Sequence, residues 1–116
     1  MIKDISERYQ VSSRHVAAIA MQESGYTLDA KHCYKIRGKI RCDFCMMQIN
    51  DRTIKNFGFD KERLMMSESY CLEAGAKVLA DLKHRFGKRE KYFWTRYNAV
   101  SKDKRKVYQQ LVERFL

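Results

Sequence analysis

Hydrophobic side chains recur every three or four residues along most of the 116-residue chain. This spacing places them on one face of an α-helix, so the pattern predicts a series of amphipathic helices. The sequence contains no proline, and glycine and polar clusters therefore mark the breaks between helices. We expect helical segments around Ile5 and Tyr9, after Ser12 or Ser13 up to Gly25, from Met46 to Phe57, from Asp60 toward Met65, from Ser67 or Ser69 to Gly87, from Tyr92 to Ala99, and from Ser101 to Phe115.

One stretch alternates polar and apolar residues instead. The alternation lies within residues 31–42 and is centred on Arg37 and Gly38, which is typical of two short strands joined by a tight turn. No repeat, linker or low-complexity segment interrupts the chain. The sequence therefore predicts a single domain over residues 1–116, mostly α-helical with one small β-hairpin.

A carboxylate interrupts the apolar face of the second expected helix. At about 100° per residue, Glu23 falls in the apolar sector of that helix and in its last turn. The other members of this sector are Val16, Ile19 and Ala20. Loss of water and the negative end of the helix dipole both disfavour the ionised form, so we expect a raised pKa for Glu23 and a role as general acid. The alternative is a side chain that simply reaches solvent where the apolar face ends.

Positive charge is in excess, with 24 Lys and Arg against 14 Asp and Glu and a net charge of +10. Such an excess favours an anionic partner (nucleic acid, anionic lipid or acidic cell-wall polymer), and the alternative is a well-solvated surface. No nucleic acid is expected, because no RNA-binding signature or distinct helix-turn-helix is evident. No run of 18 apolar residues predicts a membrane span, and no phosphate loop or metal-binding helix motif predicts a cofactor.

Four cysteines in a short chain permit two disulfides in any of three pairings. They are Cys33, Cys42, Cys45 and Cys71. A zinc site is one alternative, since Cys42 and Cys45 have the spacing of a ligand pair, but a second close pair is missing. Free thiols are the other alternative. The spacing favours disulfides and no metal.

Three short segments follow one another along the chain. Glu23-Ser24 closes a helix, residues 44–50 are FCMMQIN, and residues 96–99 are RYNA. In this order and at these intervals they resemble the soluble-type lytic transglycosylases, whose catalytic core is similar to goose lysozyme. The marks of that family are a Glu-Ser pair, a Gly-Leu-Met-Gln-Ile segment and an Ala-Tyr-Asn-x-Gly segment. The resemblance extends from about residue 5 to residue 115.

The resemblance implies a lysozyme-like fold with a substrate cleft, and cleavage of the β-1,4 bond between N-acetylmuramic acid and N-acetylglucosamine in peptidoglycan. Glu23 would protonate the bridging oxygen and then, as a base, activate the C6 hydroxyl of muramic acid, which yields a 1,6-anhydro product. The substrate-binding residues that the resemblance implies are Ser24, Met47, Gln48, Tyr97 and Asn98. Each also has a purely structural alternative, such as a helix end, a core position or a loop contact.

The chain departs from the family pattern at three positions. Cys45 stands where the family usually has Gly, Met46 where it often has Leu, and Val100 or a nearby residue where the last motif usually has Gly. A Gly lets a sugar pass close to the backbone, so Cys45 could alter the cleft. Cys45 could instead be tied to another cysteine, and Cys71 is a candidate because it lies on the buried face of its helix.

Two further functions remain open at this stage. A second carboxylate would favour a muramidase-type hydrolase. Asp29, Asp43 and Asp51 are the candidates, but none matches the second acid of goose-type lysozyme by its position in the motif, so we expect transglycosylation. The other possibility is a non-catalytic basic module that binds cell-wall polymer or nucleic acid.

The expected setting is the periplasm, where a monomer would act on glycan strands. By analogy, a secretion, pilus or conjugation machine would recruit it. No signal peptide is recognisable after Met1, so this location implies that the chain is a mature fragment with a start residue added.

Overall fold

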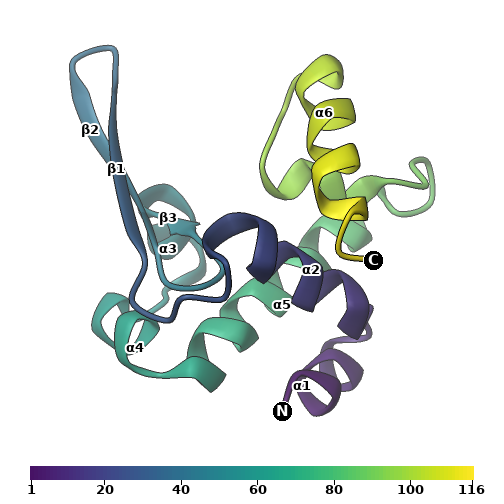
Figure 1. Cartoon of the computed structure of the whole chain (residues 1–116), viewed down its shortest axis with the longest axis horizontal. Coiled ribbons are helices and arrows are strands. Elements are labelled where there is room, and N and C mark those ends of the chain that lie inside the picture. Colours follow the sequence, from purple (N-terminus) through teal and green to yellow (C-terminus); the bar gives the residue numbers. More distant parts are fainter.

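Helices make up most of the computed structural model, which describes residues 1–116, and a small antiparallel sheet lies at one side of them (Figure 1). The helices are α1 (Ile2–Tyr9), α2 (Ser13–Ser24), α3 (Asp51–Phe57), α4 (Lys61–Met66), α5 (Glu68–Phe86), the 3₁₀-helix η1 (Phe93–Tyr97) and α6 (Lys102–Glu113). The strands are β1 (Lys31–Ile36), β2 (Lys39–Phe44) and β3 (Ile49–Asn50). The predicted fold class, mostly α with a small β element, is confirmed. None of the helices is long and apolar enough to cross a membrane.

Most helix boundaries follow from local capping chemistry. A side-chain oxygen accepts a hydrogen bond from a backbone N–H of the first turn at four starts that the sequence predicts, namely Ser12, Asp60, Ser67 and Ser101. Gly25 ends α2 with a φ of 63°, a left-handed conformation that glycine adopts without steric cost. Gly87 follows the end of α5 in a right-handed conformation, and a Cβ at this position would lie 2.4 Å from the backbone carbonyl oxygen of Lys83, so this end also depends on glycine.

The helical prediction over residues 46–57 is wrong for its first part. Residues 45–48 form a tight turn, in which Cys45 has a φ of 65° and Gln48 a φ of 51°, and strand β3 follows before α3 begins. The backbone N–H of Cys45 donates to the carbonyl of Ala30, and that of Gln48 donates to the carbonyl of Cys45. The apolar residues have helical spacing, but these tertiary and turn contacts override the local preference.

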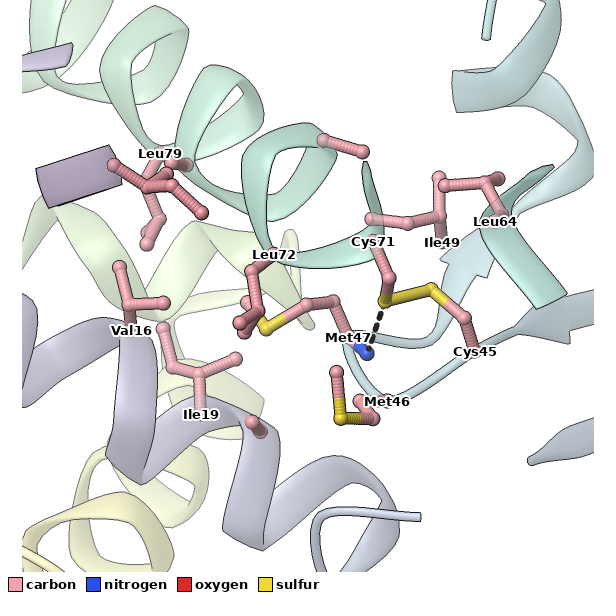
Figure 2. Close-up of a cluster of buried hydrophobic side chains, with 14 of the residues drawn as sticks. Val16, Ile19, Cys45, Met46, Met47, Ile49, Leu64, Cys71, Leu72 and Leu79 are labelled. Carbon is pink, nitrogen blue, oxygen red and sulfur yellow. Dashed lines mark hydrogen bonds between the residues drawn. A yellow bond between two sulfur atoms is a disulfide. The ribbon is translucent and has the colours of Figure 1, made fainter. Parts of the chain in front are cut away.

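Helix α5 packs directly against this turn (Figure 2). A disulfide joins Cys45 to Cys71 on α5, and the backbone N–H of Met47 lies 3.3 Å from Cys71 Sγ. A side chain at Gly75, one helical turn further, would place its Cβ 2.4 Å from Met47 Cε. Glycine at this position therefore lets the turn approach the helix closely.

The predicted hairpin is confirmed, and it extends two residues further than expected. Strands β1 and β2 pair antiparallel from Ile36↔Lys39 to Lys31↔Phe44, and Arg37 and Gly38 form the turn with positive φ angles. A disulfide links Cys33 to Cys42 across the pair. Beyond its base the hairpin projects away from the helices (Figure 1).

Candidate active site

A pocket of about 590 Å³ lies where the hairpin base, the end of α2 and the 45–48 turn meet η1 and the residue that follows it. Its lining side chains include Glu23, Tyr34, Asp43, Gln48, Tyr97 and Asn98. A second pocket of about 610 Å³ shares Asn50, Tyr97 and Asn98 with the first. The two pockets adjoin at these three residues, and we call them together the groove. The groove is the candidate for the substrate cleft that the sequence predicts.

Glu23 is held at this pocket by two donors from distant parts of the chain. The hydroxyl of Tyr108 on α6 donates to Glu23 Oε2 over 2.7 Å, and the amide Nδ2 of Asn98 lies 3.4 Å from the same oxygen. Burial raises the pKa of Glu23 to about 7, the two hydrogen bonds oppose this rise, and the charge of Asp43 adds to it. The raised pKa that its place in the apolar face predicts is therefore present.

Tyr108 is the functional residue that the sequence analysis did not find. The apolar spacing of the last helix predicts only a core position for Tyr108, and the side chain is 4% exposed. A buried tyrosine nevertheless has a hydroxyl that needs a partner, and this was the available signal. Here the partner is Glu23, and burial together with the charge of Glu23 raises the pKa of Tyr108 far above its ordinary range. Tyr108 therefore remains a neutral donor.

Asp43 is the only one of the three candidate second acids that lines the pocket. It lies on β2, half-buried, and the hydroxyl of Tyr34 is 3.5 Å from its Oδ1. Burial raises the pKa of Asp43. Asp51 instead accepts a hydrogen bond from the backbone N–H of Cys42 and forms an ion pair with Lys61, whereas Asp29 is exposed.

Two of the predicted binding residues are engaged with the protein itself. Ser24 Oγ donates to the carbonyl of Met46 over 2.9 Å and accepts from the backbone N–H of Thr27. Gln48 lines the pocket, but its Nε2 donates to the carbonyls of Ala30 and Cys45. The contacts of Ser24 give it a structural role, and Gln48 has only its amide oxygen free of protein hydrogen bonds.

Met47 and Tyr97 form a support under the pocket. The side chain of Met47 is fully buried in the core (Figure 2), which matches its structural alternative, and its contact with substrate stays a prediction. The hydroxyl of Tyr97 donates to the carbonyl oxygen of Met47 over 2.6 Å, and the side chain still lines the pocket. Burial and the nearby charge of Glu23 raise the pKa of Tyr97 well above its usual range. Tyr97 therefore fixes the turn and is neutral.

The cysteines leave no thiolate for a metal. Cys42 and Cys45, the pair with zinc-ligand spacing, are bonded to different partners, Cys33 and Cys71. No group of three or more His, Cys, Asp or Glu side chains could hold a metal ion. The disulfide also accounts for Cys45 at a position where the family usually has Gly, because its side chain is buried against α5 and not in the groove.

A mostly helical domain with a small sheet, and a glutamic acid of raised pKa facing a groove, fit a lysozyme-like protein that acts on glycans. The model of the transglycosylase SLT domain family matches residues 1–113, so the chain belongs to that family. Membership means transglycosylase-type cleavage of glycosidic bonds in cell-wall peptidoglycan. No curated protein and no solved structure matches the chain.

Proposed function

We propose that this protein is a lytic transglycosylase that cleaves the bond between N-acetylmuramic acid and N-acetylglucosamine and leaves a 1,6-anhydro end on the muramic acid. The observation that supports this most directly is Glu23, an acid with a pKa of about 7 on the wall of a groove. Such an acid can hold its proton at neutral pH and release it to a leaving oxygen.

The two hydrogen bonds to Glu23 suggest how the acid is oriented. Tyr108 and Asn98 both donate to Oε2, so the proton of the neutral form belongs on Oε1. From Oε1 the proton passes to the bridging oxygen as the bond to C1 breaks. The resulting carboxylate then takes the proton of the C6 hydroxyl while that oxygen bonds to C1, which restores the acid without water.

Hydrolysis of the same bond is the second candidate, because Asp43 shares the pocket with Glu23. A second carboxylate on the opposite wall could position a water molecule for attack at C1. Sequence position alone argued against a second acid, whereas the structure places Asp43 in the same pocket. Its bond to Tyr34 and its raised pKa describe a positioned side chain, not a freely solvated one.

The mass of the released muropeptides tests the proposal directly. Purified sacculi are digested, and the products are analysed by mass spectrometry, with Glu23→Gln as the inactive reference. Anhydro products are lighter by one water than products with reducing ends. Anhydro products support the transglycosylase, reducing ends support the hydrolase, and intact sacculi would contradict both.

The setting that we propose is the periplasm, where disulfides form readily and the wall is accessible. The protein would act there as a monomer, recruited by a secretion, pilus or conjugation machine. The net charge of +10 would hold it on an anionic wall. A non-catalytic basic module would instead bind DNA with a steep salt dependence and leave the turbidity of sacculi unchanged.

A further inference from the structure

The hairpin is strongly basic. Lys31, Lys35, Arg37, Lys39 and Arg41 stand against a single acidic residue, Asp43, within residues 31–44. The hairpin projects away from the helices (Figure 1), and all of these cations except the half-buried Arg41 are exposed. The two faces of the hairpin nevertheless differ in how they relate to the groove.

Strand alternation decides which cations share a face with the pocket. In the register of the hairpin, Tyr34 pairs with Arg41 and Ile36 pairs with Lys39. Side chains two residues apart point to the same side, so these two pairs continue the face on which Asp43 lines the pocket. The opposite face carries the disulfide, Lys35 and Lys31. Lys31, at the base of the hairpin, still lines the pocket, whereas Lys35, further out, does not.

Arg41 and Lys39 therefore follow one another along this face, at increasing distance from the pocket. At about 3.3 Å per residue, Arg41 lies roughly 7 Å and Lys39 roughly 13 Å along the strand from Asp43. The electrostatic influence of Arg41 reaches Tyr34, whose side chain is itself a wall of the pocket. A ligand bound at Glu23 could therefore extend along both cations.

We propose that the pocket-side face of the hairpin, with Arg41 and Lys39, binds the acidic stem peptide of the peptidoglycan substrate and makes the protein prefer peptide-bearing over peptide-free glycan. This inference rests on the proposed function. The peptide branches from the muramic acid at the cleaved bond and carries free carboxylates, which guanidinium and ammonium groups bind through charge-assisted hydrogen bonds. A peptide of a few residues at about 3.3 Å each covers the span from Asp43 to both cations.

Three variants, two on the pocket-side face and one on the opposite face, test the proposal. Arg41→Gln and Lys39→Gln each remove one charge from the pocket-side face, and Lys35→Gln removes one charge from the other face. The measured quantity is the ratio of kcat/KM for peptide-bearing glycan strands to kcat/KM for the same strands after amidase treatment. We expect this ratio to fall about threefold to fivefold in Arg41→Gln and less in Lys39→Gln, as for exposed ion pairs. The ratio for Lys35→Gln is expected to match that of the unaltered protein.

Binding without cleavage separates this inference from the proposed function. In the Glu23→Gln background, co-sedimentation with insoluble peptide-bearing and amidase-treated glycan reports the same preference. The unaltered protein could cleave neither form of the glycan and still bind the peptide-bearing form better, in a way that depends on Arg41. That result would contradict the proposed function and support peptide binding by the hairpin. Equal binding of both glycan forms would contradict peptide binding by the pocket-side face. An equal loss of the preference in Lys35→Gln and Arg41→Gln would contradict it as well.

A membrane is the competing partner for a basic hairpin with exposed Ile36 and Ile40. Co-sedimentation with vesicles of anionic phospholipid measures this directly. Vesicle binding that Lys35→Gln and Arg41→Gln weaken alike, with no preference between the glycan forms, would assign the hairpin to lipid and overturn the proposal.

Discussion

Two carboxylic acids line one pocket, but their surroundings on its two walls differ. On the helical wall, Glu23 lies half-buried in the last turn of α2 and is bonded to Tyr108 over 2.7 Å. On the sheet wall, Asp43 is half-buried and has only a 3.5 Å contact with Tyr34. Burial raises the pKa of both, but only for Glu23 does it bring the value to about 7. Desolvation, more than residue type, therefore determines which of the two acids is the proton donor.

Removing the acid of the helical wall should give the largest effect. Glu23→Gln keeps the shape and the hydrogen-bond acceptor but loses the transferable proton, so we expect solubilisation of sacculi to fall by about 10²- to 10⁴-fold. Glu62→Gln, at an exposed position on α4, is the matched control and should retain activity. Loss of turbidity measures both. Near-normal activity of Glu23→Gln would assign the chemistry to another group.

The same variant should be more stable than the unaltered protein above neutral pH. The folded-state pKa of Glu23 is raised from 4.5 to about 7, so the protein loses stability as pH rises through this interval, and the penalty is complete above it. Glu23→Gln has no such ionisation. We expect its free energy of unfolding at pH 8 to exceed that of the unaltered protein by about 2 kcal/mol, with this contribution vanishing toward pH 4. Urea unfolding at the two pH values measures the difference, and an equal difference at both would contradict it.

Tyr108→Phe should have a smaller effect, visible mainly in the pH profile. The hydroxyl stabilises the ionised form of Glu23, so its loss should raise the pKa of Glu23 and move the alkaline limb of activity to higher pH. Poorer positioning of the acid should lower kcat about tenfold, as for one lost hydrogen bond to a charged group. Tyr92→Phe, at an exposed tyrosine, is the control. An unshifted alkaline limb in Tyr108→Phe would contradict this role.

Asp43→Asn should give the smallest effect and the opposite direction. Removing a negative charge near Glu23 lowers the pKa of Glu23, so the alkaline limb should move to lower pH. For a transglycosylase we expect kcat at pH 5 to change by less than about threefold, the size of a weak charge interaction. Asp29→Asn is the control. A loss comparable to that of Glu23→Gln would identify Asp43 as the second acid of a hydrolase.

Local patterns account for most of the fold and for the central acid of the site. Serine and aspartate caps mark helix starts that the structure confirms, because capping involves only neighbouring residues. The position of Glu23 in an apolar sector predicts its burial and its raised pKa for the same reason. The 45–48 turn could not be predicted in this way, since its conformation depends on Ala30 and on a disulfide to α5.

The sequence by itself determined a mostly helical, basic domain with a hairpin and one acid placed to lose water, because these features depend on spacing within single elements. Only the tertiary structure decided which groups surround that acid. Tyr108 is 85 residues from Glu23 along the chain, and Asp43 lies on a strand across the pocket. Contacts of this kind arise from the packing of whole helices and strands, and that packing leaves no periodic signal in the sequence.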